Sequence, residues 1–180
     1  MQLETERLIL RPVEEEDAHA VYLMRSDPDV TFNLLSGMRT VEEAVSWVTR
    51  CRKALECKEG YQMAITLKED GRMIGVCSLL RVSWDHLNAE LVYWIGKEFW
   101  GKGYMTEAAG RLIKFGFEDL GLERIGVGCF ARNKASARVI EKLGFRYEGL
   151  ARHQFRKDGE FLDELRFSML REDFTDASGD

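Results

Sequence analysis

The chain has 180 residues, of which 45% are hydrophobic and 32% charged, so it can form one well-cored domain and is not expected to be disordered. Lysine and arginine total 26 against 31 acidic residues, and the net charge of −5 argues against a general nucleic-acid or anionic-membrane binder. No apolar stretch approaches the length of a membrane-spanning helix, and the N-terminus lacks the apolar core of a signal peptide. We therefore expect a cytoplasmic protein that does not bind membranes.

Linkers, repeats and metal-ligand spacings do not stand out anywhere in the chain. Without a Ser/Gly/Pro-rich linker, residues 1–180 are predicted to be one domain, with the last few residues as a disordered tail. The four cysteines, Cys51, Cys57, Cys77 and Cys129, contain no Cys-x-x-Cys pair, and the three histidines are scattered. We therefore expect reduced thiols and no metal site.

The hydrophobic period alternates between that of strands and that of helices along the chain. The predicted elements are a strand at Leu3–Pro12, a helix at Glu14–Arg25, a helix from the Thr40 cap to about Cys57, strands at Tyr61–Leu67, Met73–Val82 and Ala89–Ile95, a helix at Thr106–Asp119, a strand at Arg124–Phe130, a helix at Lys134–Lys142, and two strands around the turn at 157–160. About seven strands and four helices indicate a single α/β (α+β) domain.

The first motif with chemical content is Trp100-Gly101-Lys102-Gly103-Tyr104-Met105-Thr106-Glu107, between a predicted strand and a predicted helix. Glycines let the backbone approach a ligand closely, and the free N–H groups of a helix N-terminus favour a phosphate. A tight structural turn would use the same glycines. Thr106 stands where a dinucleotide fingerprint has its third small residue, and no Lys-Ser/Thr pair completes a P-loop, so both nucleotide interpretations are disfavoured.

The second motif is the helix from Asn133 to Phe145. Asn133 is a natural N-cap and Gly144 a natural C′ residue. Ser136 lies in the first turn, so a ligand near Asn133 would meet its hydroxyl. The alternative is a serine that only caps the helix or is tolerated there.

Together these motifs resemble the acyl-CoA N-acyltransferase (GNAT) superfamily, within it the branch of ribosomal-protein N-terminal acetyltransferases. The resemblance covers nearly the whole chain, from Leu3–Pro12 through Tyr93-Trp94-Ile95 and both motifs to the last strand. It implies a mixed, mostly antiparallel, twisted sheet flanked by helices, and acetyl-CoA as the acyl donor. It also implies that the backbone of Gly101–Thr106 holds the coenzyme A pyrophosphate, and that the pantetheine arm lies between strands that end near Ile95 and Phe130, hydrogen-bonded to Asn133. The implied coenzyme contacts are Ile95, Trp100, Gly101, Lys102, Gly103, Tyr104, Met105, Thr106, Asn133 and Ser136.

The resemblance also bears on the catalytic groups. Ile140 stands where many members of the superfamily have a tyrosine general acid. Met105 stands where they have a small residue, so its side chain is expected to crowd the pyrophosphate in the glycine loop. Ser136 is then the hydroxyl expected at the departing thiol. The amine must lose a proton, and Glu90 is the first candidate for the base, with Glu164, His86, His153 or water as alternatives.

The acceptor is less specified. The branch suggests a protein N-terminal α-amine, while a small amine such as a polyamine, an antibiotic or an amino acid stays open, as do a non-catalytic acyl-CoA-binding domain and a monomer or homodimer. The superfamily builds acceptor specificity in the segment that corresponds to Phe32–Met38. The aromatic pairs Tyr93-Trp94 and Phe99-Trp100 are predicted to be core residues.

Overall fold

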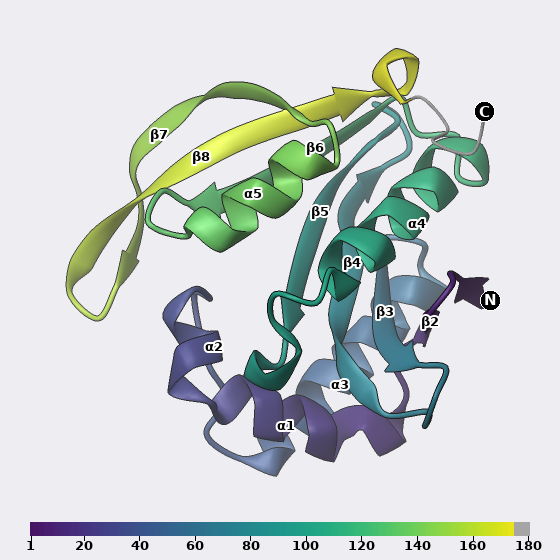
Figure 1. The fold of residues 1–180 in the computed structure, drawn as a ribbon, viewed down its shortest axis with the longest axis vertical. Helices are drawn as coiled ribbons and strands as arrows, with labels where there is room; N and C mark the ends of the chain where they lie inside the picture. Colours follow the sequence, from purple (N-terminus) through teal and green to yellow (C-terminus); the bar gives the residue numbers. More distant parts are fainter. Residues whose placement is uncertain (175–180) are drawn as a thin grey trace.

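One sheet carries all the strands of the described chain. The computed structural model describes residues 1–174, in which eight strands are ordered β1-β2-β3-β4-β5-β6-β8-β7 (Figure 1). Their bounds are Leu3–Glu4 (β1), Leu8–Pro12 (β2), Gly60–Leu67 (β3), Met73–Ser83 (β4), Asn88–Ile95 (β5), Arg124–Phe130 (β6), Arg146–Lys157 (β7) and Glu160–Leu170 (β8). Only the pair β5 and β6 is parallel. The predicted mixed, mostly antiparallel sheet is confirmed.

Two elements were not expected from the sequence. The first strand is divided into β1 and β2 by a turn in which the Thr5 N–H donates to the Leu8 carbonyl at 3.0 Å. The Asp27-Pro28 pair ends one helix and also begins another, because the Asp27 side chain accepts from the Asp29 N–H and Pro28 stands in the first turn. The expected C-terminal tail lies outside the described residues.

Five α-helices surround the sheet in the described part of the chain. They are Ala18–Ser26 (α1), Pro28–Phe32 (α2), Val41–Glu56 (α3), Tyr104–Glu118 (α4) and Lys134–Lys142 (α5). The Thr40 hydroxyl caps α3 by accepting from the Glu43 N–H at 3.3 Å, as the capping signature predicts. None of the helices in residues 1–174 is long and apolar enough to cross a membrane.

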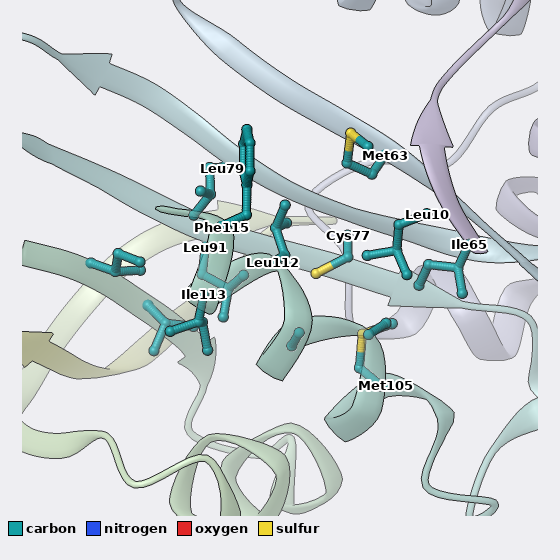
Figure 2. Packing of buried hydrophobic residues seen from close by; sticks show 14 of the residues in the cluster. Leu10, Met63, Ile65, Cys77, Leu79, Leu91, Met105, Leu112, Ile113 and Phe115 are labelled. Carbon is teal, nitrogen blue, oxygen red and sulfur yellow. The ribbon is translucent and has the colours of Figure 1, made fainter. Parts of the chain in front are cut away.

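The two faces of the sheet bury separate apolar clusters. On the α4 face, side chains from α4 pack against those of β2–β5, and Figure 2 shows Leu112 and Ile113 of α4 near Leu79 and Leu91. On the α3 face, α1 and α3 cover the other side of the sheet and bury Trp94. Because side chains alternate along a strand, Leu91 and Tyr93 of β5 lie on the α4 face, while Glu90, Val92 and Trp94 lie on the α3 face.

Candidate active site

The parallel pair β5–β6 is joined over only half of its length. Residues Asn88–Leu91 pair with Arg124–Val127, and the pairing then stops. β5 continues to Ile95 beside β4, and β6 continues to Phe130 beside β8. Figure 1 shows the two strands diverging, with α5 beside β6. We call residues 92–95 and 128–130 the divergent end; strand edges that no longer pair can accept an extended ligand.

The glycine loop lies between the end of β5 and α4. Gly101 and Gly103 have φ angles of 74° and 80°, in the left-handed region that glycine adopts without strain. Gly103 is the N-cap of α4, so the first helical N–H groups after it have no partner within the helix. Gly101, Lys102 and Gly103 are exposed. This arrangement suits a phosphate or pyrophosphate.

Ser136 and Tyr93 meet beside the divergent end. The Asn133 side chain accepts from the Ser136 N–H at 3.1 Å, which places Ser136 in the first turn of α5. The hydroxyl oxygens of Tyr93 and Ser136 are 2.9 Å apart. Burial raises the pKa of Tyr93, so its hydroxyl is protonated at neutral pH. Two hydroxyl groups that can donate hydrogen bonds therefore lie together here.

Cys129, near the end of β6, is the cysteine at this site. Burial raises the pKa of its thiol to about 11, against the opposing effect of a hydrogen bond with the Ser136 side chain. At neutral pH the thiol is protonated and is a poor nucleophile. This chemistry does not suit a covalent acyl carrier.

Glu90 lies on the α3 face of β5. Both of its carboxylate oxygens accept from Arg81 Nη1, at 2.8 and 2.7 Å, and the side chain is 47% exposed. Its register partner on β6 is Gly126, which is still in the paired part of the two strands. Glu90 therefore stands before the divergent end and is already bound to a cation.

Glu164 of β8 lies on the same face but reaches the divergent end itself. An added Cβ on Gly128 would stand 2.3 Å from Glu164 Oε1, so the carboxylate lies directly over the Gly128 backbone. Arg166 Nε donates to Oε2 at 3.0 Å, and the side chain is only 17% exposed. Gly128 is the residue at which pairing with β5 has just ended. Because only glycine leaves room for this carboxylate, Glu164 and Gly128 form one structural unit.

Comparison with known proteins identifies the family. The family model of the acetyltransferase (GNAT) domain matches residues 7–146. The chain belongs to the GNAT acetyltransferase family. It is 32% identical over 170 residues to the uncharacterized N-acetyltransferase YoaA of Bacillus subtilis (strain 168), and the aligned region covers 94% of this chain and 96% of that protein. A GNAT-family acetyltransferase structure from Bacillus anthracis is similar with a TM-score of 0.86 and 29% identity, over 96% of this chain and 99% of that one. A spermidine N(1)-acetyltransferase of Escherichia coli (strain K12) is 26% identical over 92% of this chain and 87% of its own.

The protein is thus an acetyl-CoA-dependent N-acetyltransferase with a single mixed α/β GNAT domain. Within the described residues of this acetyltransferase, no three His, Cys, Asp or Glu side chains are grouped as a metal site. Ile140, at the position of the tyrosine of other members, is fully buried in the core on the α4 face.

Two expectations about large side chains change with the structure. Met105 does not crowd the glycine loop: its side chain is 7% exposed and packs in the core, as Figure 2 shows, so only its backbone faces the loop. Trp94 and Phe99 are core residues, but the prediction of a buried Trp100 is wrong. Trp100 is 45% exposed because it follows the last turn before the loop, where its indole N–H donates to the Ile95 carbonyl at 3.0 Å.

The α2 segment, residues 28–34, connects the parts of the acetyltransferase site that diverge. Lys97, just after β5, pairs with Asp29, and Arg132, just after β6, donates to the Phe32 carbonyl at 2.6 Å. Lys157 of β7 donates to the Leu34 carbonyl at 2.8 Å. The segment therefore spans the opening between the two strands, and it overlaps the region in which acceptor specificity was expected.

The histidines are a weaker match to the site. His153 stacks on Phe161 in the β7–β8 hairpin, with ring centroids 4.9 Å apart. His86 is exposed in the connection between β4 and β5. The His153 ring therefore packs within the hairpin, although the His153 N–H donates to Asp163 Oδ1 at 2.7 Å and the Asp163 carbonyl accepts from the Ala131 N–H, just after the divergent end.

Proposed function

We propose that this acetyltransferase transfers the acetyl group of acetyl-CoA directly to the α-amine of a polypeptide N-terminus. The observation that carries the choice of acceptor is that the acids of the α3 face near the divergent end are already paired with arginines. A polyamine, with several positive charges, is best bound by carboxylates that have no cation of their own. Glu90 pairs with Arg81, and Glu164 pairs with Arg166. A single α-amine on an otherwise uncharged extended chain does not need such unpaired carboxylates.

Acetyl-CoA is proposed to bind along the divergent end. The N–H groups from Gly101 to Thr106 would hold the pyrophosphate, supported by their place at the start of α4. The pantetheine arm would lie along the edge of β5 up to Ile95, and the Asn133 amide nitrogen would donate to one of its carbonyl groups. The Asn133 oxygen already accepts from Ser136, which orients that amide.

The transfer follows from this placement. The amine nitrogen attacks the thioester carbonyl carbon, and strand N–H groups at the divergent end stabilise the oxyanion. The C–S bond then breaks, and the Ser136 hydroxyl donates a hydrogen bond to the sulfur as negative charge develops on it. Before the attack, the ammonium group loses one proton to a carboxylate, directly or through water; the second proton that the nitrogen loses as the intermediate collapses goes to the departing thiolate.

A first expected result concerns the choice of nucleotide ligand. Coenzyme A and acetyl-CoA, at about 100 times their Kd, should stabilise the folded protein by about 2.7 kcal/mol. For a domain of this size that corresponds to a rise in Tm of about 5–10 °C. NAD and ATP at equal concentration should give no comparable rise, and thermal melting measures all four. A larger shift with NAD would support a dinucleotide site instead.

A second expected result concerns the base. The geometry favours Glu164 over Glu90, because Glu164 lies at the divergent end with Oε1 over Gly128, whereas both oxygens of Glu90 are held by Arg81. Glu164→Gln should lower kcat/KM at neutral pH by about 10²-fold, with partial recovery at higher pH, where more of the amine is already neutral. Pre-steady-state and steady-state rates across pH measure this.

Glu90→Gln is the matched variant, since it makes the same change on the same face. If turnover falls only in this variant, Glu90 is the base. If neither variant loses rate, bulk water removes the proton, and the enzyme acts by positioning its two substrates.

The acceptor itself is tested by titration calorimetry with acetyl-CoA, followed by a panel in which thiol release is measured. The panel holds short peptides with a free α-amine, the same peptides with a blocked N-terminus, spermidine, and single amino acids. We expect release with the free peptides alone. Release with spermidine but not with peptides would assign a polyamine acceptor, and binding of acetyl-CoA without release on any amine would indicate a non-catalytic acyl-CoA-binding domain.

A further inference from the structure

The turn between β1 and β2 reaches across the molecule to the glycine loop. Glu107, in the first turn of α4, accepts from the Thr5 hydroxyl at 2.6 Å and from the Arg7 N–H at 2.9 Å, both through Oε1. Its Oε2 accepts from Arg7 Nε at 2.7 Å and from Arg7 Nη2 at 2.6 Å. Arg7 and Glu107 are 100 positions apart in the sequence.

Arg7 also contacts the loop directly. Its Nη1 donates to the Lys102 carbonyl at 3.0 Å, and its guanidinium lies over the Tyr104 ring, 4.5 Å from the centroid. A Cβ on Gly103 would find Arg7 Nη2 at 3.5 Å and no other neighbour within 4 Å. Each nitrogen of the guanidinium therefore contacts either Glu107 or the backbone of the loop.

These contacts determine where one loop N–H points. In a planar trans peptide, the C=O of one residue and the N–H of the next point to opposite sides. Because the Lys102 carbonyl is held toward Arg7, the Gly103 N–H points away from Arg7 and is free for a ligand on the other side of the peptide. Gly103 itself has a φ of 80°.

We propose that Arg7 and Glu107 are positioning residues for the coenzyme: they hold the glycine loop with the Gly103 N–H directed at the pyrophosphate, and Arg7 acts through the Lys102 carbonyl rather than as a phosphate ligand. This inference rests on the proposed coenzyme site. It extends that site to the β1–β2 turn, which no feature of the loop sequence indicates. A loop already in its bound conformation loses less entropy when the ligand binds.

Two variants separate positioning from direct binding of phosphate. Glu107→Gln keeps Arg7 and its charge. It replaces one carboxylate oxygen, which accepts hydrogen bonds from Thr5 or Arg7, with an amide N–H₂ group, which can only donate them. Arg7→Lys keeps the positive charge but cannot bind Glu107 and the Lys102 carbonyl together. Positioning predicts that each variant raises the Kd for acetyl-CoA by about tenfold or more, with kcat at saturating acetyl-CoA changed by less than about twofold. A direct phosphate ligand predicts that Glu107→Gln, which frees Arg7, binds acetyl-CoA as tightly as the wild type or more tightly.

A shorter donor distinguishes positioning from general damage to the fold. S-acetylpantetheine carries the thioester but no pyrophosphate, so both variants should use it with a kcat/KM within about twofold of the wild type. Loss of activity with both donors would indicate a structural role only and would overturn the proposal. Arg124→Lys is the control, because Arg124 makes a comparable two-oxygen contact with Glu148, at 2.8 and 2.7 Å, away from the loop. It should leave the Kd for acetyl-CoA unchanged.

The experiment uses the full chain, with titration calorimetry for Kd and thermal melting to show that each variant is folded. Arg7 is 43% exposed, so Arg7→Lys provides the test if Glu107→Gln does not fold. If the wild type binds acetyl-CoA and both variants bind it equally tightly, this inference alone would be overturned. A wild type that does not bind acetyl-CoA would overturn the proposed coenzyme site and, with it, this inference.

Discussion

Replacing Gly103 by valine is expected to weaken acetyl-CoA binding by at least about 100-fold while the protein stays folded. Gly103 has a φ of 80°, which a β-branched residue adopts only with strain, so the loop must change conformation to accommodate valine. Two charge-assisted hydrogen bonds from the loop to a pyrophosphate, at about 1.5 kcal/mol or more each, correspond to about 3 kcal/mol of binding energy. Their loss is about a 100-fold change in Kd.

Gly71 provides the matched control. It lies in the turn between β3 and β4 with a φ of 73°, and an added Cβ would meet nothing within 4 Å. Gly71→Val therefore introduces a similar backbone strain, of about 1–2 kcal/mol, away from the site. Calorimetry on both variants should show lost acetyl-CoA binding for Gly103→Val and wild-type binding for Gly71→Val. A folded Gly103→Val protein with the wild-type Kd would show that the coenzyme is bound elsewhere.

Ser136→Ala should lower kcat by about 10²-fold while the Kd for acetyl-CoA changes by less than about threefold. The hydroxyl would donate to the sulfur only as charge builds there, so its contribution belongs to the transition state. The cap of α5 is retained in this variant, because it is the backbone N–H of Ser136 that donates to Asn133. A loss of stability is therefore not expected to account for the lost rate.

Two further variants make the Ser136 result specific. Tyr93→Phe removes the hydroxyl that lies 2.9 Å from Ser136 Oγ and should lower kcat less than Ser136→Ala, since Tyr93 would orient the serine. Ser168→Ala removes a buried serine that donates to Glu148 at 2.8 Å, and it should leave kcat unchanged. A stable and fully active Ser136→Ala enzyme would remove the assigned role from Ser136 and Tyr93 together.

Much of the fold could be predicted because its determinants are local in the sequence. The β3–β4 hairpin, β6 and α5 follow from short-range alternation, a polar turn and the Asn133 cap, which act over a few residues. The sequence did not predict α2 because the Asp27-Pro28 pair is compatible with two structures: proline can end one helix, and it also suits the first turn of the next. The family assignment came from two motifs in order, and the match over residues 7–146 confirms it.

The candidate site also has parts that local sequence patterns predict and parts that depend on contacts between distant residues. By itself the sequence determined the glycine loop, the serine of the first turn and the family, because each is a short motif with its own backbone requirement. Only the tertiary structure decided that Tyr93 meets Ser136, that Glu164 lies over Gly128, and that Arg7 and Glu107 hold the loop. These contacts join residues on different elements, up to 100 positions apart. They depend on the order of strands in the sheet and on where β5 and β6 stop pairing, which no local pattern specifies.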